Sequence, residues 1–135
     1  MTDPAAVQAQ FENAIDPAYS GQQLNDKMGI RFSQAGKERV VGTMPAKGNL
    51  QPYGLLHGGA NAVLAESIGS LCAALNAGPD KAAMGLELSC THHRGVRDGT
   101  VTGVATPLHV GRGTVTVDIV LTDDRGRRTC TARLT

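Results

Sequence analysis

Residues 51–77, QPYGLLHGGANAVLAESIGSLCAALNA, constrain the fold of this chain more than any other segment. Apolar residues recur there at the spacing of an α-helix, which predicts a helix from about Gly58 to Asn76, ended by the segment AGPD. The predicted helix carries a single charged residue, Glu66. Because a surface helix normally keeps one face polar to meet water, this helix must be covered on nearly every side.

The predicted helix has two contrasting faces. At about 100° per residue, the leucine and isoleucine side chains form one stripe, which we expect to pack on a sheet: Leu64, Ile68, Leu71 and Leu75. The opposite face consists of small residues and the glutamate: Gly59, Ala62, Glu66, Gly69, Ser70 and Ala73. Small residues let a second backbone approach closely, and the chain offers no other long helix. We therefore expect a second copy of the chain against this face, in a dimer or larger homo-oligomer. The alternative is a helix wrapped by its own sheet.

The remainder of the chain predicts one α+β domain. Asp3 followed by Pro4 favours a short helix, so we assign residues 1–23 to an N-terminal helical segment and residues 24–135 to the main domain. The candidate strands, several of them rich in Thr and Val with period-two alternation, are residues 29–34, 37–46, 82–94, 99–108, 112–124 and 127–135. A mostly antiparallel sheet with one dominant helix is the expected architecture.

Composition narrows the functional classes. A net charge of +1 over 135 residues gives no overall attraction for nucleic acid or membranes. No apolar run approaches the roughly 18 to 20 residues that cross a bilayer, and the first residues lack the hydrophobic segment of a secretion signal. We expect a cytoplasmic protein whose three cysteines, Cys72, Cys90 and Cys130, are buried reduced thiols. A cysteine nucleophile is the less favoured alternative.

Glu66 is the first candidate for catalysis. A buried carboxylate without a partner is energetically costly, so such a residue is usually either paired or functional. Ser70 lies one helical turn further on the same side and could hold a water molecule beside the carboxylate. The structural alternative is a buried ion pair between Glu66 and an arginine from elsewhere in the chain.

The segment HGG, residues 57–59, opens the predicted helix. Amide N–H groups at a helix start lack intrahelical partners, and the helix dipole is positive there. Gly58 and Gly59 have no side chain to keep a substrate carbonyl away, so the segment favours an oxyanion hole. Gln51 and His57 could add donors or orient the ligand, although a histidine in isolation is more often structural.

Gly58 and Glu66 are too far apart to act on one carbonyl from the same helix. Eight residues at about 1.5 Å each separate them by about 12 Å. If two such helices pack antiparallel across a dimer axis, Glu66 of one chain can approach Gly58 of the other. The dimer that explains the small-residue face would then also assemble a site.

Four segments resemble the hotdog-fold acyl-CoA thioesterases: QPYGLLHGGANAVLAESIGS, GLELSCTHHRGVRDG, TPLHVGRG and DDRGRRTCTARLT. The sequence is most similar to the 4-hydroxybenzoyl-CoA thioesterase branch and its relatives that hydrolyse 1,4-dihydroxy-2-naphthoyl-CoA, over residues 24–134. The resemblance implies a hotdog fold and hydrolysis of an acyl-CoA, with an aromatic acyl group, to the free acid and coenzyme A. It also implies a tetramer of paired dimers and neither metal nor cofactor.

The resemblance further implies roles for individual residues. Glu66 would be the nucleophile or the general base toward water, and the Gly58 amide would polarise the thioester carbonyl. Gln51 and His57 would support that carbonyl or the surroundings of the departing sulfur, and Ser70 would position the water.

Binding residues follow from the same resemblance. His92 and Gly59 would be substrate-binding residues, with His92 lining the pocket. Neighbouring side chains on a strand point to opposite faces, so at most one of His92 and His93 should do so. The residues that would meet the coenzyme A phosphates are Arg94, Arg97, Gly111 and Arg112.

Two other functional classes and a metal site fit the sequence less well. Hotdog hydratases and dehydratases also place a histidine and a carboxylate near a central helix, but their histidine segments are spaced differently. A non-catalytic acyl-CoA-binding regulator would need a DNA-binding module, for which the N-terminal segment is too short and insufficiently basic. Cys90 and His92 with His93 could suggest zinc, but adjacent ligands would diverge, so no metal is expected.

Overall fold

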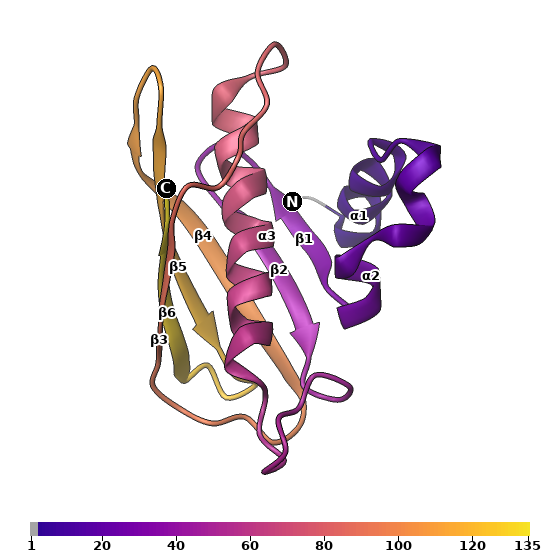
Figure 1. Ribbon diagram of the computed structural model, residues 1–135, viewed down its shortest axis with the longest axis vertical. Coiled ribbons are helices and arrows are strands. Elements are labelled where there is room, and N and C mark those ends of the chain that lie inside the picture. Colours follow the sequence, from indigo (N-terminus) through magenta and orange to yellow (C-terminus); the bar gives the residue numbers. More distant parts are fainter. Residues whose placement is uncertain (1–2) are drawn as a thin grey trace.

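The computed structural model describes residues 3–135, in which one long helix lies on a six-stranded antiparallel sheet (Figure 1). The strands are β1 (Arg31–Ala35), β2 (Val40–Pro45), β3 (Leu88–His92), β4 (Thr100–Val110), β5 (Val115–Thr122) and β6 (Arg128–Leu134), in the spatial order β1-β2-β4-β5-β6-β3. The helices are α1 (Pro4–Asn13), the 3₁₀ helix η1 (Pro17–Gln22), α2 (Leu24–Met28) and α3 (Gly58–Ala77). The predicted α+β hotdog arrangement is confirmed.

Two facing glycines allow α3 to lie close to the sheet. Gly42 of β2 is the cross-strand partner of Gly103 of β4. A Cβ atom at these positions would lie 2.6 Å and 2.7 Å from the side chain of Ile68, closer than two carbon atoms can approach. Ile68 and Leu64 occupy the resulting depression and are fully buried. The missing side chains on the sheet therefore set how closely α3 packs on it.

The sheet-facing side of α3 is rotated relative to the predicted leucine stripe. Leu64 and Ile68 are fully buried as expected, whereas Leu71 and Leu75 are only partly buried. Gly69 was assigned to the opposite face, and that prediction was wrong. It is buried, and a Cβ there would lie 2.7 Å from Leu134 of β6. Gly69 thus serves close packing within the chain, a use of small residues that a helical projection does not distinguish from packing between chains.

The period-two patterns of the last two strands are confirmed. The fully or nearly fully buried side chains on one face are Val117, Ile119 and Leu121 in β5 and Cys130, Ala132 and Leu134 in β6. Thr129 departs from the alternation, because the register shifts between Leu121 and Thr122. It is fully buried, and its hydroxyl donates to the Leu121 carbonyl at 3.2 Å.

The N-terminal helices pack beside β1. Asp3 caps α1 as predicted, its Oδ1 accepting from the Ala5 N–H at 3.0 Å. Gln8 accepts a hydrogen bond from the Phe32 N–H at 2.7 Å, and the rings of Phe11 and Phe32 lie 4.4 Å apart between centroids. α1 is thereby joined to β1 by a polar and an apolar contact.

Helix α3 is apolar over a longer stretch than we expected when we looked for membrane-spanning segments. By length and composition it could cross a membrane, and it is the one such helix in residues 3–135, so the expectation that no segment approached that length was wrong. A core helix packed against a sheet has the same length and composition. Here the face of α3 that carries Leu64 and Ile68 is fully buried by the protein itself.

Candidate functional site

Glu66 lies near the middle of α3, half-buried. The Ser70 hydroxyl donates to its Oε1 at 3.2 Å, as the one-turn spacing predicts. The backbone at Gly85, in the segment before β3, lies directly against the carboxylate, because a Cβ at this position would collide with Oε1. Within residues 3–135 no ion pair includes Glu66. The structural alternative, a pair with an arginine, is therefore not found in the protomer.

The Glu66 pocket is a concavity of about 380 Å³ between α2 and α3. Its lining residues are Gln23, Leu24, Asn25, Ala62, Val63, Glu66 and Ser67. The Ser67 hydroxyl donates to Asn25 at 2.8 Å, which ties α2 to α3 at the edge of the pocket. No local sequence pattern predicts that α2 lies there, because this contact joins residues 42 positions apart.

At the start of α3, one of the two glycine N–H groups is free for a ligand. His57 is the N-cap residue, and its Nδ1 accepts from the Gly59 N–H at 2.8 Å. The Ala60 N–H bonds to the His57 carbonyl at 2.9 Å. In residues 3–135 no acceptor is found for the Gly58 N–H. Gly58 therefore keeps an unengaged N–H donor within residues 3–135, whereas the Gly59 amide is already engaged and His57 caps the helix.

The Gly58 pocket is a second concavity, of about 320 Å³. It is lined by Gln51, Leu55, Leu56, Gly58, Asn61, His92, His93, Arg94 and Gly95. Gln51 accepts the Tyr53 N–H through Oε1, which leaves its NH₂ group as the donor end of the side chain. The structure thus brings together Gln51, Gly58, His92 and Arg94, four of the residues that the resemblance implied.

Both His92 and His93 border this pocket, so the expectation that at most one would do so was wrong. Strand β3 ends at His92, and the alternation of side chains therefore does not extend to His93. Only the His92 ring is found against Gly58, with Nε2 3.0 Å from the position that a Cβ of residue 58 would take. The His93 ring is hydrogen-bonded to the Thr131 hydroxyl at 2.9 Å.

Asn61 is a pocket residue that the sequence reasoning missed. Its side chain is 4% exposed, and its amide nitrogen lies 3.2 Å from Nδ1 of His92. Its Oδ1 is buried and has no hydrogen-bond partner in the described part of the chain. A polar residue three positions after Gly58, beside the apolar stripe of the helix, was the available signal.

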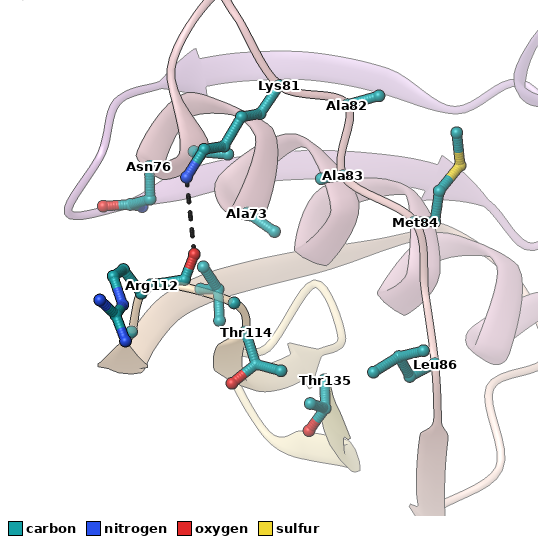
Figure 2. A pocket seen from close by; sticks show the side chains of 14 residues that line it. Ala73, Asn76, Lys81, Ala82, Ala83, Met84, Leu86, Arg112, Thr114 and Thr135 are labelled. Atoms are coloured by element: carbon teal, nitrogen blue, oxygen red, sulfur yellow. Dashed lines mark hydrogen bonds between the residues drawn. The ribbon is translucent and has the colours of Figure 1, made fainter.

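Arg112 and Gly111 belong to a different part of the protomer. They border a concavity of about 190 Å³ at the C-terminal end of α3, the opposite end from Gly58 (Figures 1 and 2). Figure 2 shows Lys81 reaching toward the Arg112 carbonyl, 3.5 Å away. Arg94 borders the Gly58 pocket instead, and the exposed Arg97 borders neither concavity. One protomer therefore does not gather the residues implied for phosphate binding into a single cluster.

The three cysteines line none of these concavities. Burial raises the pKa of the Cys72 thiol, and burial with the nearby Cys90 raises the pKa of Cys130 to about 12. The pKa of Cys90 is also raised, chiefly by burial. Thiols that resist ionisation are poor nucleophiles, so the structure does not support a cysteine nucleophile.

In residues 3–135 no three His, Cys, Asp or Glu side chains are placed to hold a metal ion.

Comparisons with known proteins identify the family and support the fold. The model of the Thioesterase superfamily matches residues 53–130. The proofreading thioesterase EntH of Cronobacter turicensis is 44% identical over 112 residues, which cover 82% of each chain. A mutant thioesterase of Pseudomonas aeruginosa is 40% identical with a TM-score of 0.83, covering 93% of this chain and 88% of that one. A hypothetical thioesterase of Streptococcus pneumoniae, solved with coenzyme A, is 25% identical with a TM-score of 0.70, covering 78% and 81%.

The long helix on its six-stranded antiparallel sheet is a hotdog fold, and the relatives that share it at 40% identity or more are thioester hydrolases. The chain belongs to the Thioesterase superfamily, and it is a thioesterase. The hydratase and binding-protein alternatives are not supported by these relatives.

Proposed function

We propose that this protein hydrolyses coenzyme A thioesters of aromatic acyl groups, with each active site shared between two protomers. One observation carries the proposal. Glu66 has no basic partner in residues 3–135, and the Gly58 N–H, at the start of the same helix, has no acceptor there. A carboxylate that acts as base or nucleophile and a donor to the oxyanion are the two groups that hydrolysis of a thioester needs most.

The separation of these two groups supports a shared site. The Glu66 pocket and the Gly58 pocket have no lining residue in common. Along α3 the two groups are about 12 Å apart, too far to act on one carbonyl. Two copies of α3 packed antiparallel and crossing near Ala62, midway between the two groups, would bring Glu66 of one protomer to Gly58 of its partner. Such dimers would pair further into a tetramer.

The chemistry follows from the positions of the groups. The Gly58 N–H lies at the positive end of α3 and stabilises the charge that develops on the thioester oxygen. As a general base, Glu66 takes a proton from a water molecule held by Ser70, and that water attacks the carbonyl carbon. The carbon–sulfur bond then breaks, and coenzyme A leaves as a thiolate. As a nucleophile, Glu66 attacks the carbonyl carbon directly, and the carbon–sulfur bond breaks so that coenzyme A leaves as a thiolate. Water then hydrolyses the resulting acyl anhydride to the free acid and restores the Glu66 carboxylate.

Recognition of coenzyme A is supported by the basic residues around the pockets. In residues 3–135 the ion pairs involve neither Arg94, Arg97 nor Arg112, so their guanidinium groups are available to phosphate. The Streptococcus pneumoniae neighbour was solved with coenzyme A. The preference for an aromatic acyl group rests on the family resemblance, since the chain has only two Phe, two Tyr and no Trp.

A substrate panel tests the proposal. Benzoyl-, phenylacetyl-, naphthoyl- and fatty acyl-CoA are compared by the rate of thiol release, and crotonyl-CoA is assayed in parallel for hydration. We expect the highest kcat/KM for an aromatic thioester and no hydration of crotonyl-CoA. Higher kcat/KM for fatty acyl-CoA would overturn the aromatic preference, and hydration in place of hydrolysis would overturn the reaction.

A further inference from the structure

We propose that Asn61 is a positioning residue that holds His92 with its proton on Nε2, so that this N–H stands beside the Gly58 N–H as a second donor to the thioester oxygen. The inference rests on the proposed function of the same site and adds two assignments to it. His92 becomes a hydrogen-bond donor to the reacting group, and Asn61 becomes the residue that determines which ring nitrogen carries the proton.

The hydrogen bond between the two side chains fixes the tautomer. The amide nitrogen of Asn61 lies 3.2 Å from Nδ1 of His92. A carboxamide nitrogen can only donate, so Nδ1 must accept and carries no proton. In a neutral imidazole the proton is then on Nε2.

Burial determines which end of the Asn61 amide faces the ring. The side chain is 4% exposed, and the atom pointing away from His92 has no partner in residues 3–135. In the observed orientation this atom is a carbonyl oxygen, so one acceptor is unsatisfied. Reversing the amide would move an NH₂ group, which has two hydrogens to satisfy, into the buried position where the carbonyl oxygen now lies. The amide nitrogen therefore belongs on the ring side.

The position of the His92 ring places its Nε2 atom beside Gly58, where the Nε2–H group can act as a second donor. Nε2 lies 3.0 Å from the position of a Cβ on residue 58, so the ring sits beside the glycine whose N–H is free. His92 and Gly58 border the same concavity of about 320 Å³. Two preorganised donors directed at one oxygen stabilise the developing negative charge more than one donor does.

Substituting aspartate for Asn61 gives a nearly isosteric reversal of the hydrogen bond. A carboxylate accepts hydrogen bonds, so Asn61→Asp would place a proton on Nδ1 of His92. In the neutral ring, Nε2 would then carry no proton. Asn61→Leu removes the hydrogen bond and adds no charge. Comparing these two variants distinguishes the effect of the direction of the hydrogen bond from the effect of its presence.

The test combines ¹⁵N NMR of the histidine rings in the ligand-free protein with steady-state hydrolysis. His92 is assigned by the loss of its signals in His92→Gln. In the wild type we expect a protonated Nε2 and an unprotonated Nδ1. In Asn61→Asp we expect a protonated Nδ1, with kcat lowered by about 10²-fold, the cost of losing one oxyanion donor, and KM little changed. Asn61→Leu should show a mixture of ring tautomers and a smaller loss.

His93 provides the matched control, because its ring bonds to Thr131 and not to Asn61. Thr131→Val should shift the His93 signals only and leave the His92 signals and kcat unchanged. A wild-type His92 that carries its proton on Nδ1 would overturn the inference. A wild-type kcat in Asn61→Asp would also overturn it. If Asn61→Asp does not fold, unchanged His92 signals in Asn61→Leu would overturn the inference instead.

The outcomes also separate this inference from the proposed function. An inactive Glu66→Gln together with a fully active, folded Asn61→Asp would remove the role of Asn61 and leave the thioesterase site intact. A fully active Glu66→Gln would remove the proposed mechanism, whatever the tautomer of His92.

Discussion

The first turn and the middle turn of α3 offer opposite chemistry on one helix. Around Gly58 the pocket presents donors, namely the free amide, the Gln51 NH₂ group and the His92 ring. The Glu66 pocket presents a carboxylate and a hydroxyl, with no basic side chain among its lining residues. Each pocket supplies what the other lacks, and the rise of the helix keeps them apart within a protomer. This contrast is the basis of our proposal that the catalytic unit is a pair of helices from two protomers.

The largest expected effect comes from neutralising the acidic half. Glu66→Gln keeps the size of the side chain and its contact with Ser70 but cannot take a proton or attack carbon. We expect kcat to fall by about 10²- to 10⁴-fold, the usual contribution of a general base. Binding of a non-hydrolysable acyl-CoA analogue, measured by calorimetry, should be largely unchanged. Full activity would remove Glu66 from the mechanism.

The next effect comes from deleting the amide donor of the other half. Gly58 is the first residue of α3, where proline fits a helix; the substitution removes the N–H and adds a Cβ beside His92. His57 already has the extended backbone that precedes proline, with φ −63° and ψ 133°. We expect Gly58→Pro to lower kcat by about 10²- to 10³-fold.

Gly58→Ala is the matched control, because it adds the same Cβ beside His92 and keeps the N–H. It should lose much less activity than Gly58→Pro. Equal losses in the two variants would mean that crowding of His92, and not the missing donor, causes the defect.

A smaller effect is expected from the backbone that holds Glu66 in place. A Cβ at Gly85 would collide with the carboxylate, so Gly85→Ala must displace it. We expect kcat to fall by about tenfold, because a small misplacement of a catalytic group costs up to about 10²-fold. Gly21→Ala is the control, since a Cβ there meets nothing within 4 Å. Wild-type kcat in Gly85→Ala would show that the carboxylate position is not critical.

The smallest effect should fall on KM. Arg94 borders the Gly58 pocket and is exposed, so it contributes one partly solvated contact to a coenzyme A phosphate. Arg94→Ala should raise KM for acyl-CoA about three- to tenfold with little change in kcat. Arg125→Ala, in the turn between β5 and β6, is the control for loss of one positive charge. An unchanged KM would exclude Arg94 from phosphate binding.

Local sequence signals were enough for the elements that carry the site. The histidine and glycines of HGG, the breaker after Ala77 and the one-turn spacing of Glu66 and Ser70 each act within a few residues. The start of α3, its end and the Ser70 contact could therefore be predicted. The acidic half of the site was evident for the same reason, since a lone carboxylate on an apolar helix is conspicuous.

The parts that escaped prediction depend on contacts distant in sequence. Asn61 meets His92 across 31 residues, and α2 reaches the Glu66 pocket through a contact spanning 42. Gly69 packs on the sheet because β5 and β6 pass beneath it. The separation of Arg94 from Arg112 follows from the strand order, in which β3 lies beyond β6 while the β4–β5 turn is at the far end of α3.

The most direct test of a shared site is complementation between two inactive variants. Glu66→Gln and Gly58→Pro are mixed under conditions that exchange subunits, and exchange is verified by native mass spectrometry. In a mixed dimer one site carries both defects and the other carries none. An equal mixture should therefore recover about a quarter of wild-type activity, since half of the dimers are mixed. Verified exchange without any recovery would contradict an active site built from two protomers.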